Sequence, residues 1–148
     1  MTEEKKIKGR KRHLLVDHLG FPLALELTAA NVGDREGFKL LLDKYKENTP
    51  NIVFADSGYK GKDFEQECMN QGVKVQPVPR NEGWCLKTNS LKVIQGFQVV
   101  AKRWIVERSF AWLGKYRRMV KDYELILTVS KAMIWMVFIR LLLSRLGN

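Results

Sequence analysis

The chain has 148 residues, of which 45% are apolar and 28% charged, and its net charge at pH 7 is +10. This apolar content can bury a core, which excludes a disordered polybasic tail and favours one domain. We find no stretch of about 18 uninterrupted apolar residues and expect no membrane partner. The first residues lack a signal-peptide core and the two cysteines form no CxxC pair, so we expect a reduced, cytoplasmic protein.

The positive charge lies in two short blocks. Residues 1–12 carry six bases and two acids, and residues 99–121 carry seven bases and one acid. The segment between them is nearly neutral. Clustered bases indicate a polyanionic partner, most often nucleic acid. A solvated basic surface explains the first block equally well when it is taken alone, and the second block favours nucleic acid.

After a basic arm at residues 1–12, the pattern predicts a β-hairpin over residues 13–28. Leucines alternate along its second half, and turn residues precede them. Apolar residues at i, i+3, i+4 and i+7 from Phe38 then predict an amphipathic helix, with Asp34 as its N-cap and an end near Asn48.

Residues 51–78 predict a strand–helix–strand unit. A short apolar strand ends at Ala55, a helix follows over about 62–70, and Gly72 is its expected C′ residue before the second strand. Such a unit implies a parallel pair of strands and an α/β architecture.

Two long helices are expected at the C-terminal end, within residues 97–146. They cover roughly Phe97–Tyr123 and Thr128–Leu146. The second is apolar nearly all round, so we expect it to be buried in this chain or against a partner.

Asp56 follows the first strand of residues 51–78 directly. Ligands gather at the carboxyl ends of parallel strands in α/β sheets, so Asp56 is a candidate metal ligand. An Asx-turn or a helix cap is the alternative, and the spacing alone favours that alternative.

Glu107 is the single acid among the bases of residues 99–121. On a continuous helix, the apolar residues of this stretch occupy one arc, and Glu107 lies near the middle of the other. Small residues at i+4 and i+7 leave room for a ligand to approach it. A surface ion-pair network with Arg103 and Arg108 is an equally weighted alternative.

Carboxylates on a basic surface suit phosphoryl transfer, in which paired Mg²⁺ ions bridge to substrate phosphates and the bases hold the nucleic-acid backbone. The bases expected to contact DNA are Lys5, Lys6, Lys8, Arg10, Lys11, Arg12, Arg103, Arg108, Lys115 and Arg118.

Four segments in order resemble bacterial insertion-sequence transposases of the DDE class, of the insertion-sequence-five type. They are Lys5–Asp17, Thr28–Asp34, Ala55–Tyr59 and Arg103–Leu113. The resemblance covers nearly the whole chain. Arg103 matches a family Arg four residues before the Glu, whereas the family Lys seven residues after it is replaced by Gly114, with Lys115 next.

The resemblance implies the chemistry and the fold. The family cleaves and joins DNA strands with an Asp-Asp-Glu triad and Mg²⁺ or Mn²⁺, on a ribonuclease-H-like mixed sheet flanked by helices. By the resemblance, Asp56 is the second Asp and Glu107 is the Glu, both catalytic and both metal ligands. The implied DNA partners are the transposon ends and the target.

The family's first Asp lies on a strand upstream of the first basic block. We therefore expect residues 1–148 to be one partial catalytic domain without its first strand, inactive or incomplete alone. An upstream transposase segment, or self-association, would be a further partner. The alternative is a non-catalytic basic DNA-binding protein or a regulator of the full-length transposase.

Overall fold

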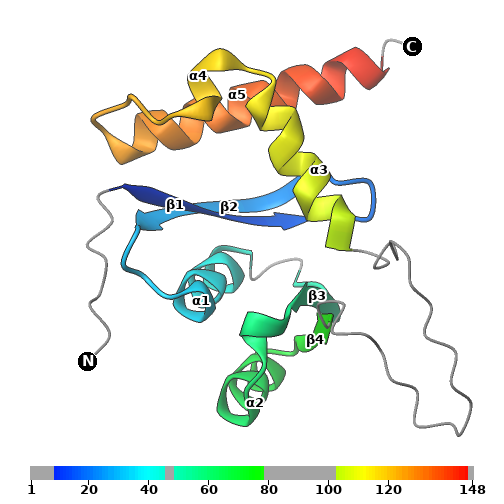
Figure 1. The fold of residues 1–148 in the computed structure, drawn as a ribbon. Coiled ribbons are helices and arrows are strands. Elements are labelled where there is room, and N and C mark those ends of the chain that lie inside the picture. The colour runs from blue at the N-terminus through cyan, green and yellow to red at the C-terminus, as the bar shows by residue number, and fades with distance from the viewer. Residues whose placement is uncertain (1–8, 46–48, 79–102, 147–148) are drawn as a thin grey trace, which may run out of the picture. The chain divides into compact units, whose positions relative to one another are not determined.

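The computed structural model describes residues 9–45, 49–78 and 103–146, which fold as two compact units. The hairpin unit comprises residues 1–50 and 105–148, and the strand–helix–strand unit comprises residues 51–104. The described strands form two separate two-stranded sheets (Figure 1). The architecture is therefore mixed α/β with small sheets.

The sheet of the hairpin unit pairs β1 (Arg10–Val16) with β2 (Pro22–Ala29) in antiparallel fashion. Asp17 closes the turn, because its Oδ1 accepts hydrogen bonds from two backbone N–H groups of the turn at 2.9 and 2.8 Å. The strand starts three residues earlier than the predicted hairpin. The end of the predicted arm, residues 10–12, is therefore part of β1.

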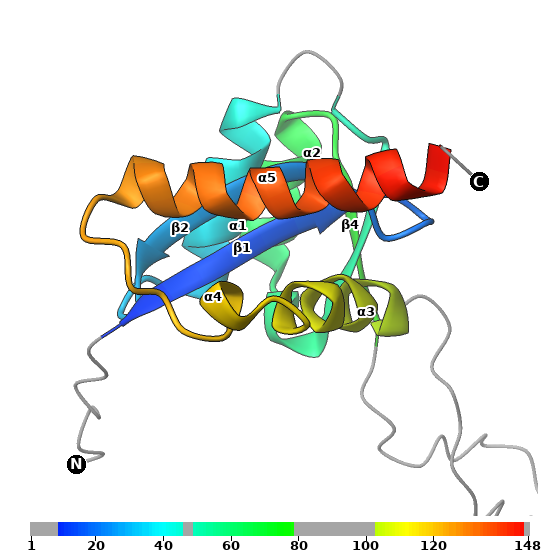
Figure 2. The ribbon, with the colours of Figure 1, turned by 90° about the horizontal axis from the view of Figure 1, so that it is seen from above.

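Helices cover both faces of this hairpin. The helix α1 (Asp34–Lys44) lies on one face, and α3 (Arg103–Gly114), α4 (Arg117–Val120) and α5 (Leu127–Leu146) lie on the other (Figure 1). Figure 2 shows α5 running along the hairpin. The buried core on this second face consists of Leu25, Leu27, Trp112, Leu113, Met119, Ile134, Val137 and Phe138.

The helix α1 packs closely on β1 through a glycine. A Cβ added at Gly37 would lie 2.1 Å from Cε1 of the buried His13 ring, so the ring fits only because this position has no side chain. Burial lowers the pKa of His13, and its Nε2 lies 2.8 Å from Oγ1 of Thr28. The predicted N-cap is wrong by one residue. Gly33 is the N-cap, without a side-chain hydrogen bond, and Asp34 is the first helical residue.

A buried carboxylate links β2 to helices on both faces. Glu26 accepts hydrogen bonds from Lys44 at the end of α1 and from Lys131 of α5. Burial alone would raise the pKa of Glu26, but the hydrogen bonds from the two lysines outweigh burial and lower it. The bond to Glu26 in turn raises the pKa of Lys44.

The strand–helix–strand unit has the predicted local structure. Strands β3 (Ile52–Asp56) and β4 (Lys74–Val78) are parallel, and α2 (Lys62–Asn70) connects them after the short helix η2 (Ser57–Tyr59). Gly72 has a φ of 80°, which agrees with the predicted C′ position.

The predicted helix over residues 97–123 is not continuous in its described part. The helix α3 ends at Gly114, Tyr116 is extended, and α4 follows as a separate short helix. Glycine is a poor helix former, and the break lets Met119 enter the core. The start of the predicted helix, residues 97–102, lies outside the described residues.

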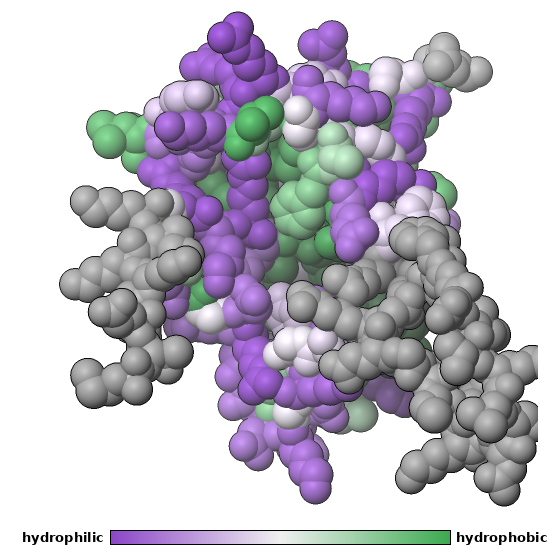
Figure 3. All heavy atoms as spheres, viewed as in Figure 1, coloured by the Kyte–Doolittle hydropathy of each residue, from purple (hydrophilic) through white to green (hydrophobic). Residues whose placement is uncertain are grey.

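The last helix, α5, is not buried all round. Ser130, Ile134, Val137 and Phe138 are buried, whereas large apolar residues on the opposite side are exposed. Among the described residues, α5 alone is long and apolar enough to cross a membrane, a criterion that core helices of soluble proteins also meet. Figure 3 shows hydrophobic residues at the surface among hydrophilic ones where α3, α4 and α5 lie.

Candidate functional site

Asp56 is the last residue of β3, at the carboxyl end of the parallel pair. It also caps η2, since its Oδ1 accepts hydrogen bonds from the backbone N–H of Ser57 at 2.6 Å and from its hydroxyl at 3.2 Å. The capping alternative from the sequence is therefore confirmed. Both hydrogen bonds use Oδ1, and the side chain is only partly buried. Capping holds the carboxylate in a fixed orientation at the strand end.

Glu107 lies on the exposed side of α3, in the hairpin unit. The opposite side of this helix is anchored to the turn between β1 and β2. The buried Ser109 donates a hydrogen bond from Oγ to the carbonyl of Gly20 at 2.6 Å. Arg108 donates to the carbonyl of Leu19, and its guanidinium lies 5.0 Å from the ring centroid of Trp112. This anchor fixes the rotation of α3 and so the direction in which Glu107 projects.

The sequence did not identify the Ser109 anchor. The hydroxyl bonds a residue 89 positions away, and no local pattern reports such a contact. Arg108, a predicted DNA contact, binds the carbonyl of Leu19 and lies over the ring of Trp112 in its own chain. Arg103 is the first residue of α3 and precedes Glu107 by four positions.

The remaining predicted bases near Glu107 follow the break in the helix. Lys115 comes directly after α3, and Arg118 lies on α4, so they do not continue the helical face of Glu107. Both are exposed. The guanidinium of Arg118 lies 3.3 Å from Glu124, with 71% of the Arg118 side chain exposed. These two side chains can therefore reach a phosphate backbone without breaking core contacts.

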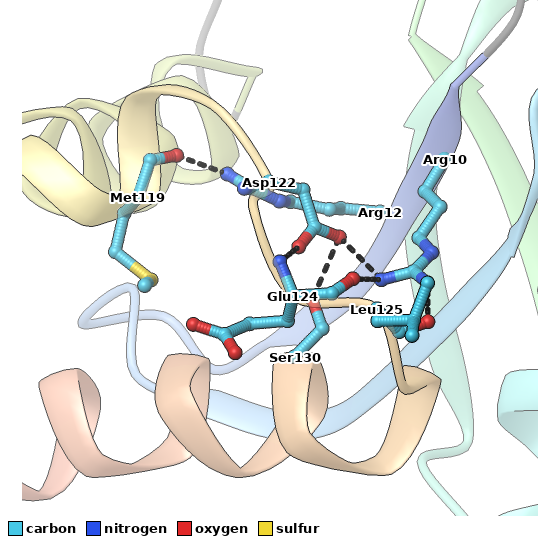
Figure 4. A network of polar contacts seen from close by, with 7 residues as sticks. All are labelled: Arg10, Arg12, Met119, Asp122, Glu124, Leu125 and Ser130. Atoms are coloured by element: carbon cyan, nitrogen blue, oxygen red, sulfur yellow. Dashed lines mark hydrogen bonds and ion pairs between the residues drawn. The ribbon is translucent and has the colours of Figure 1, made fainter.

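The described bases of the first block contact their own chain. Arg10 donates to Oδ2 of Asp122 at 3.0 Å and to the carbonyls of Glu124 and Leu125, each at 2.7 Å. Arg12 donates to the carbonyl of Met119 at 2.7 Å (Figure 4). These bonds hold the segment between α4 and α5 against β1.

Asp122 is the centre of this network, and no local sequence pattern indicates this role. Besides Arg10, it accepts hydrogen bonds from the hydroxyl of Ser130 at 2.8 Å and the backbone N–H of Glu124 at 3.1 Å (Figure 4). Burial alone would raise the pKa of Asp122, but these hydrogen bonds together lower it. The carboxylate therefore stays ionised where it stabilises the loop.

The other bases of the first block divide into two groups. Lys11 donates from Nζ to the carbonyl of Val32 at 2.7 Å and to Asp34 at 3.0 Å. Lys5, Lys6 and Lys8 lie outside the described residues.

The two candidate metal ligands have suitable chemistry, because carboxylate oxygens are the donors that Mg²⁺ prefers. The part of the chain that the structure describes contains no group of three or more His, Cys, Asp or Glu residues able to hold a metal ion. Asp56 belongs to the strand–helix–strand unit, and Glu107 belongs to the hairpin unit.

Comparison with known proteins identifies a family and a relative of similar sequence. The profile of the family described as "Transposase DDE domain" matches residues 1–142. A Burkholderia cepacia protein, "Putative transposase for insertion sequence element IS402", is 30% identical over 125 residues. That match covers 78% of this chain and 54% of the relative, so the chain spans about half the length of the relative. No solved structure matches the chain.

Proposed function

The chain belongs to the transposase DDE domain family, and we propose that it supplies the later part of an enzyme that cleaves and joins DNA strands. The observation that carries the proposal is the family match over residues 1–142, with Asp56 at a strand end and Glu107 on an anchored helix. The relative of similar sequence carries a transposase name, which supports the same activity.

In this proposal Asp56 and Glu107 are the second and third carboxylates of the site. Families of this type depend on divalent metal ions, and Mg²⁺ or Mn²⁺ would polarise the phosphate and activate the attacking oxygen. The chain's own contribution is orientation. The hydrogen bonds to Ser57 hold Asp56, and the Ser109 anchor holds the helix of Glu107. Preorganised ligands of this kind lose little entropy when a metal and a phosphate bind.

The proposed complete fold is ribonuclease-H-like, with a first strand provided by an upstream transposase segment. Within the described residues each unit has one two-stranded sheet, and the proposal adds a further strand to the fold. Such a strand would bring the first Asp of the triad.

The exposed bases Lys115 and Arg118 are the proposed contacts to the DNA backbone, with Arg103 beside Glu107 in sequence. Phosphate contacts position a duplex without reading its bases. Arg10 and Arg12 have a structural role in this proposal, because their N–H groups already bind the segment after α4.

The test is strand transfer by a transposase reconstituted from this chain and the segment encoded upstream of it. Glu107→Gln keeps the size of the side chain and removes its charge. We expect loss of Mg²⁺-dependent strand transfer with DNA binding retained. The matched control is Glu36→Gln, an exposed Glu on α1 of the same unit, which should keep full activity.

Unchanged strand transfer in Glu107→Gln would overturn the catalytic assignment. The second candidate is a regulator that binds DNA without catalysis, and the exposed bases Lys115 and Arg118 support it because they could contact DNA without a metal site. That candidate predicts that wild-type chain and Glu107→Gln inhibit or assist the full-length enzyme equally.

A further inference from the structure

The last turn of α5 contacts the same part of the molecule on which α3 is anchored. Arg145 lies in this last turn, and its guanidinium lies 5.0 Å from the ring centroid of Phe21 and 4.3 Å from that of Trp112. The centroids of the two rings are 5.8 Å apart. Phe21 directly precedes β2 in the turn of the hairpin, and Trp112 belongs to α3. Arg145 therefore joins three elements that are far apart in the sequence (Figure 2).

Trp112 is the side chain through which this contact reaches α3. It is 8% exposed and belongs to the buried core of the hairpin unit. The guanidinium of Arg108 lies 5.0 Å from the same ring centroid, so two guanidinium groups lie near one indole ring. A cation within about 6 Å of a ring centroid is attracted by the ring, and a planar guanidinium can also stack on it. Trp112 is therefore held from α5 as well as from its own helix.

The contact gives α3 a second support. The hydrogen bonds of Ser109 and Arg108 both end on the turn of the hairpin. A helix that is held at one place can still tilt about it, whereas a contact from another element limits the tilt. The helix α5 is a firm support, because one of its sides is buried in the core. Glu107 precedes Trp112 by little more than one helical turn, so a tilt of α3 would displace its carboxylate.

We propose that Arg145 is a positioning residue for Glu107, which it orients through Trp112 and α3. This inference rests on the proposed function, in which Glu107 is a metal ligand. It gives the end of α5 a part in strand transfer that needs no contact between Arg145 and the metal or the DNA. Removal of the contact would displace the carboxylate without deleting it. DNA would still bind, but the reacting groups would be out of line.

The kinetics of the reconstituted transposase separate this role from a phosphate contact, because Arg145 is itself an exposed base. In Arg145→Ala the rate of strand transfer at saturating DNA should fall about tenfold, since small displacements of reacting groups are costly. The DNA concentration that gives half the maximal rate should not change. Arg145→Lys should restore little, because an ammonium lacks the planar group that lies over the rings. A raised half-maximal DNA concentration at an unchanged maximal rate, or full rescue by lysine, would overturn positioning and indicate a phosphate contact.

The matched control is Arg140→Ala. Arg140 is an exposed arginine of the same helix, and its guanidinium lies 5.8 Å from the ring centroid of Tyr116, which follows the end of α3. This variant also removes a contact between a cation and a ring, and it should keep the maximal rate. Circular dichroism of both alanine variants should equal that of the wild type. An equal fall in rate in the two variants would overturn a specific role of Arg145.

A nitroxide label at Glu107→Cys tests the position of α3 without catalysis. The labelled chain also carries Cys85→Ser, and Cys68 is buried. Electron paramagnetic resonance should show a more mobile label when Arg145→Ala is added, and no change when Arg140→Ala is added.

The label also separates this inference from the proposed function. Unchanged mobility of the label in Arg145→Ala would overturn the positioning role, whatever the activity of the enzyme. If the label responds as expected and Glu107→Gln keeps full strand transfer, the proposed function fails, whereas the control of position 107 by Arg145 stands.

Discussion

Two basic regions of the hairpin unit use the same residue types in opposite ways. At the start of β1, Arg10 and Arg12 bind carbonyls and a carboxylate of their own chain. At the junction of α3 and α4, Lys115 and Arg118 remain exposed. A count of charges makes both regions candidate DNA surfaces. The structure separates a region whose bases hold the fold together from one whose bases are exposed at the surface.

The difference depends on which acceptors lie nearby. The last carbonyls of a helix have no partner within that helix, and Met119 is in the last turn of α4. The guanidinium of Arg12 supplies a partner. Arg10 spans three acceptors at once, which its planar group with five N–H donors allows. In the proposed function, exposed bases with few protein acceptors would donate to DNA phosphates instead.

The strongest test of this contrast is Arg10→Ala. The change removes three hydrogen bonds, one of them to a partly buried carboxylate, and should lower the free energy of unfolding by about 2 kcal/mol. Urea unfolding measures it. Arg10→Lys should restore only part of the loss, because one ammonium cannot reach all three acceptors. If Arg10→Ala kept the full free energy of unfolding, Arg10 would not stabilise the fold, and the contrast between the two basic regions would be wrong.

The opposite test replaces Lys115 and Arg118 together by Ala. Loss of two phosphate contacts should weaken DNA binding about tenfold and reduce the slope of log affinity against log salt by about 2. The free energy of unfolding should change by less than about 0.5 kcal/mol, since both side chains are exposed. Fluorescence anisotropy over a salt series measures the slope. Lys62→Ala, at an exposed base on α2, is the control and should leave the slope unchanged.

The smallest expected effect is on acid stability. The folded chain lowers the pKa of Asp122 below its ordinary value of 3.8. The unfolded chain therefore takes up the proton first, and stability from this group is present above about pH 3.8 and is lost as pH falls through the folded pKa. Asp122→Asn should flatten the stability profile in this acid window. Asp63→Asn, at an exposed carboxylate on α2, should keep the wild-type profile.

Sequence reasoning succeeded where the determinants are local. The bounds of α2 and the C′ position of Gly72 follow from periodicity and turn chemistry within a few residues, and both are confirmed. The capping role of Asp56 depends on the next residue and was likewise foreseen as an alternative.

Sequence reasoning failed where contacts between residues far apart in the sequence determine the structure. The periodicity around Glu107 continues through Gly114, yet the helix ends at Gly114, and Met119 then packs into the core against residues of β2 and α5. The role of Arg10 depends on acceptors 112 to 115 positions away. The positions of Asp56 and Glu107 in their elements agree with a DDE site, and their catalytic roles stay a proposal.

One measurement tests those roles most directly, namely a metal-specificity switch at the proposed ligands. In the reconstituted transposase, Asp56→Cys and Glu107→Cys replace a hard oxygen donor by a thiolate, which binds Mg²⁺ poorly and softer ions better. We predict that strand transfer is lost in Mg²⁺ and partly restored in Mn²⁺, whereas Asp63→Cys is active in both. Equal activity of the two ligand variants in Mg²⁺ and Mn²⁺, whether lost or retained, would contradict the assignment of Asp56 and Glu107 as metal ligands.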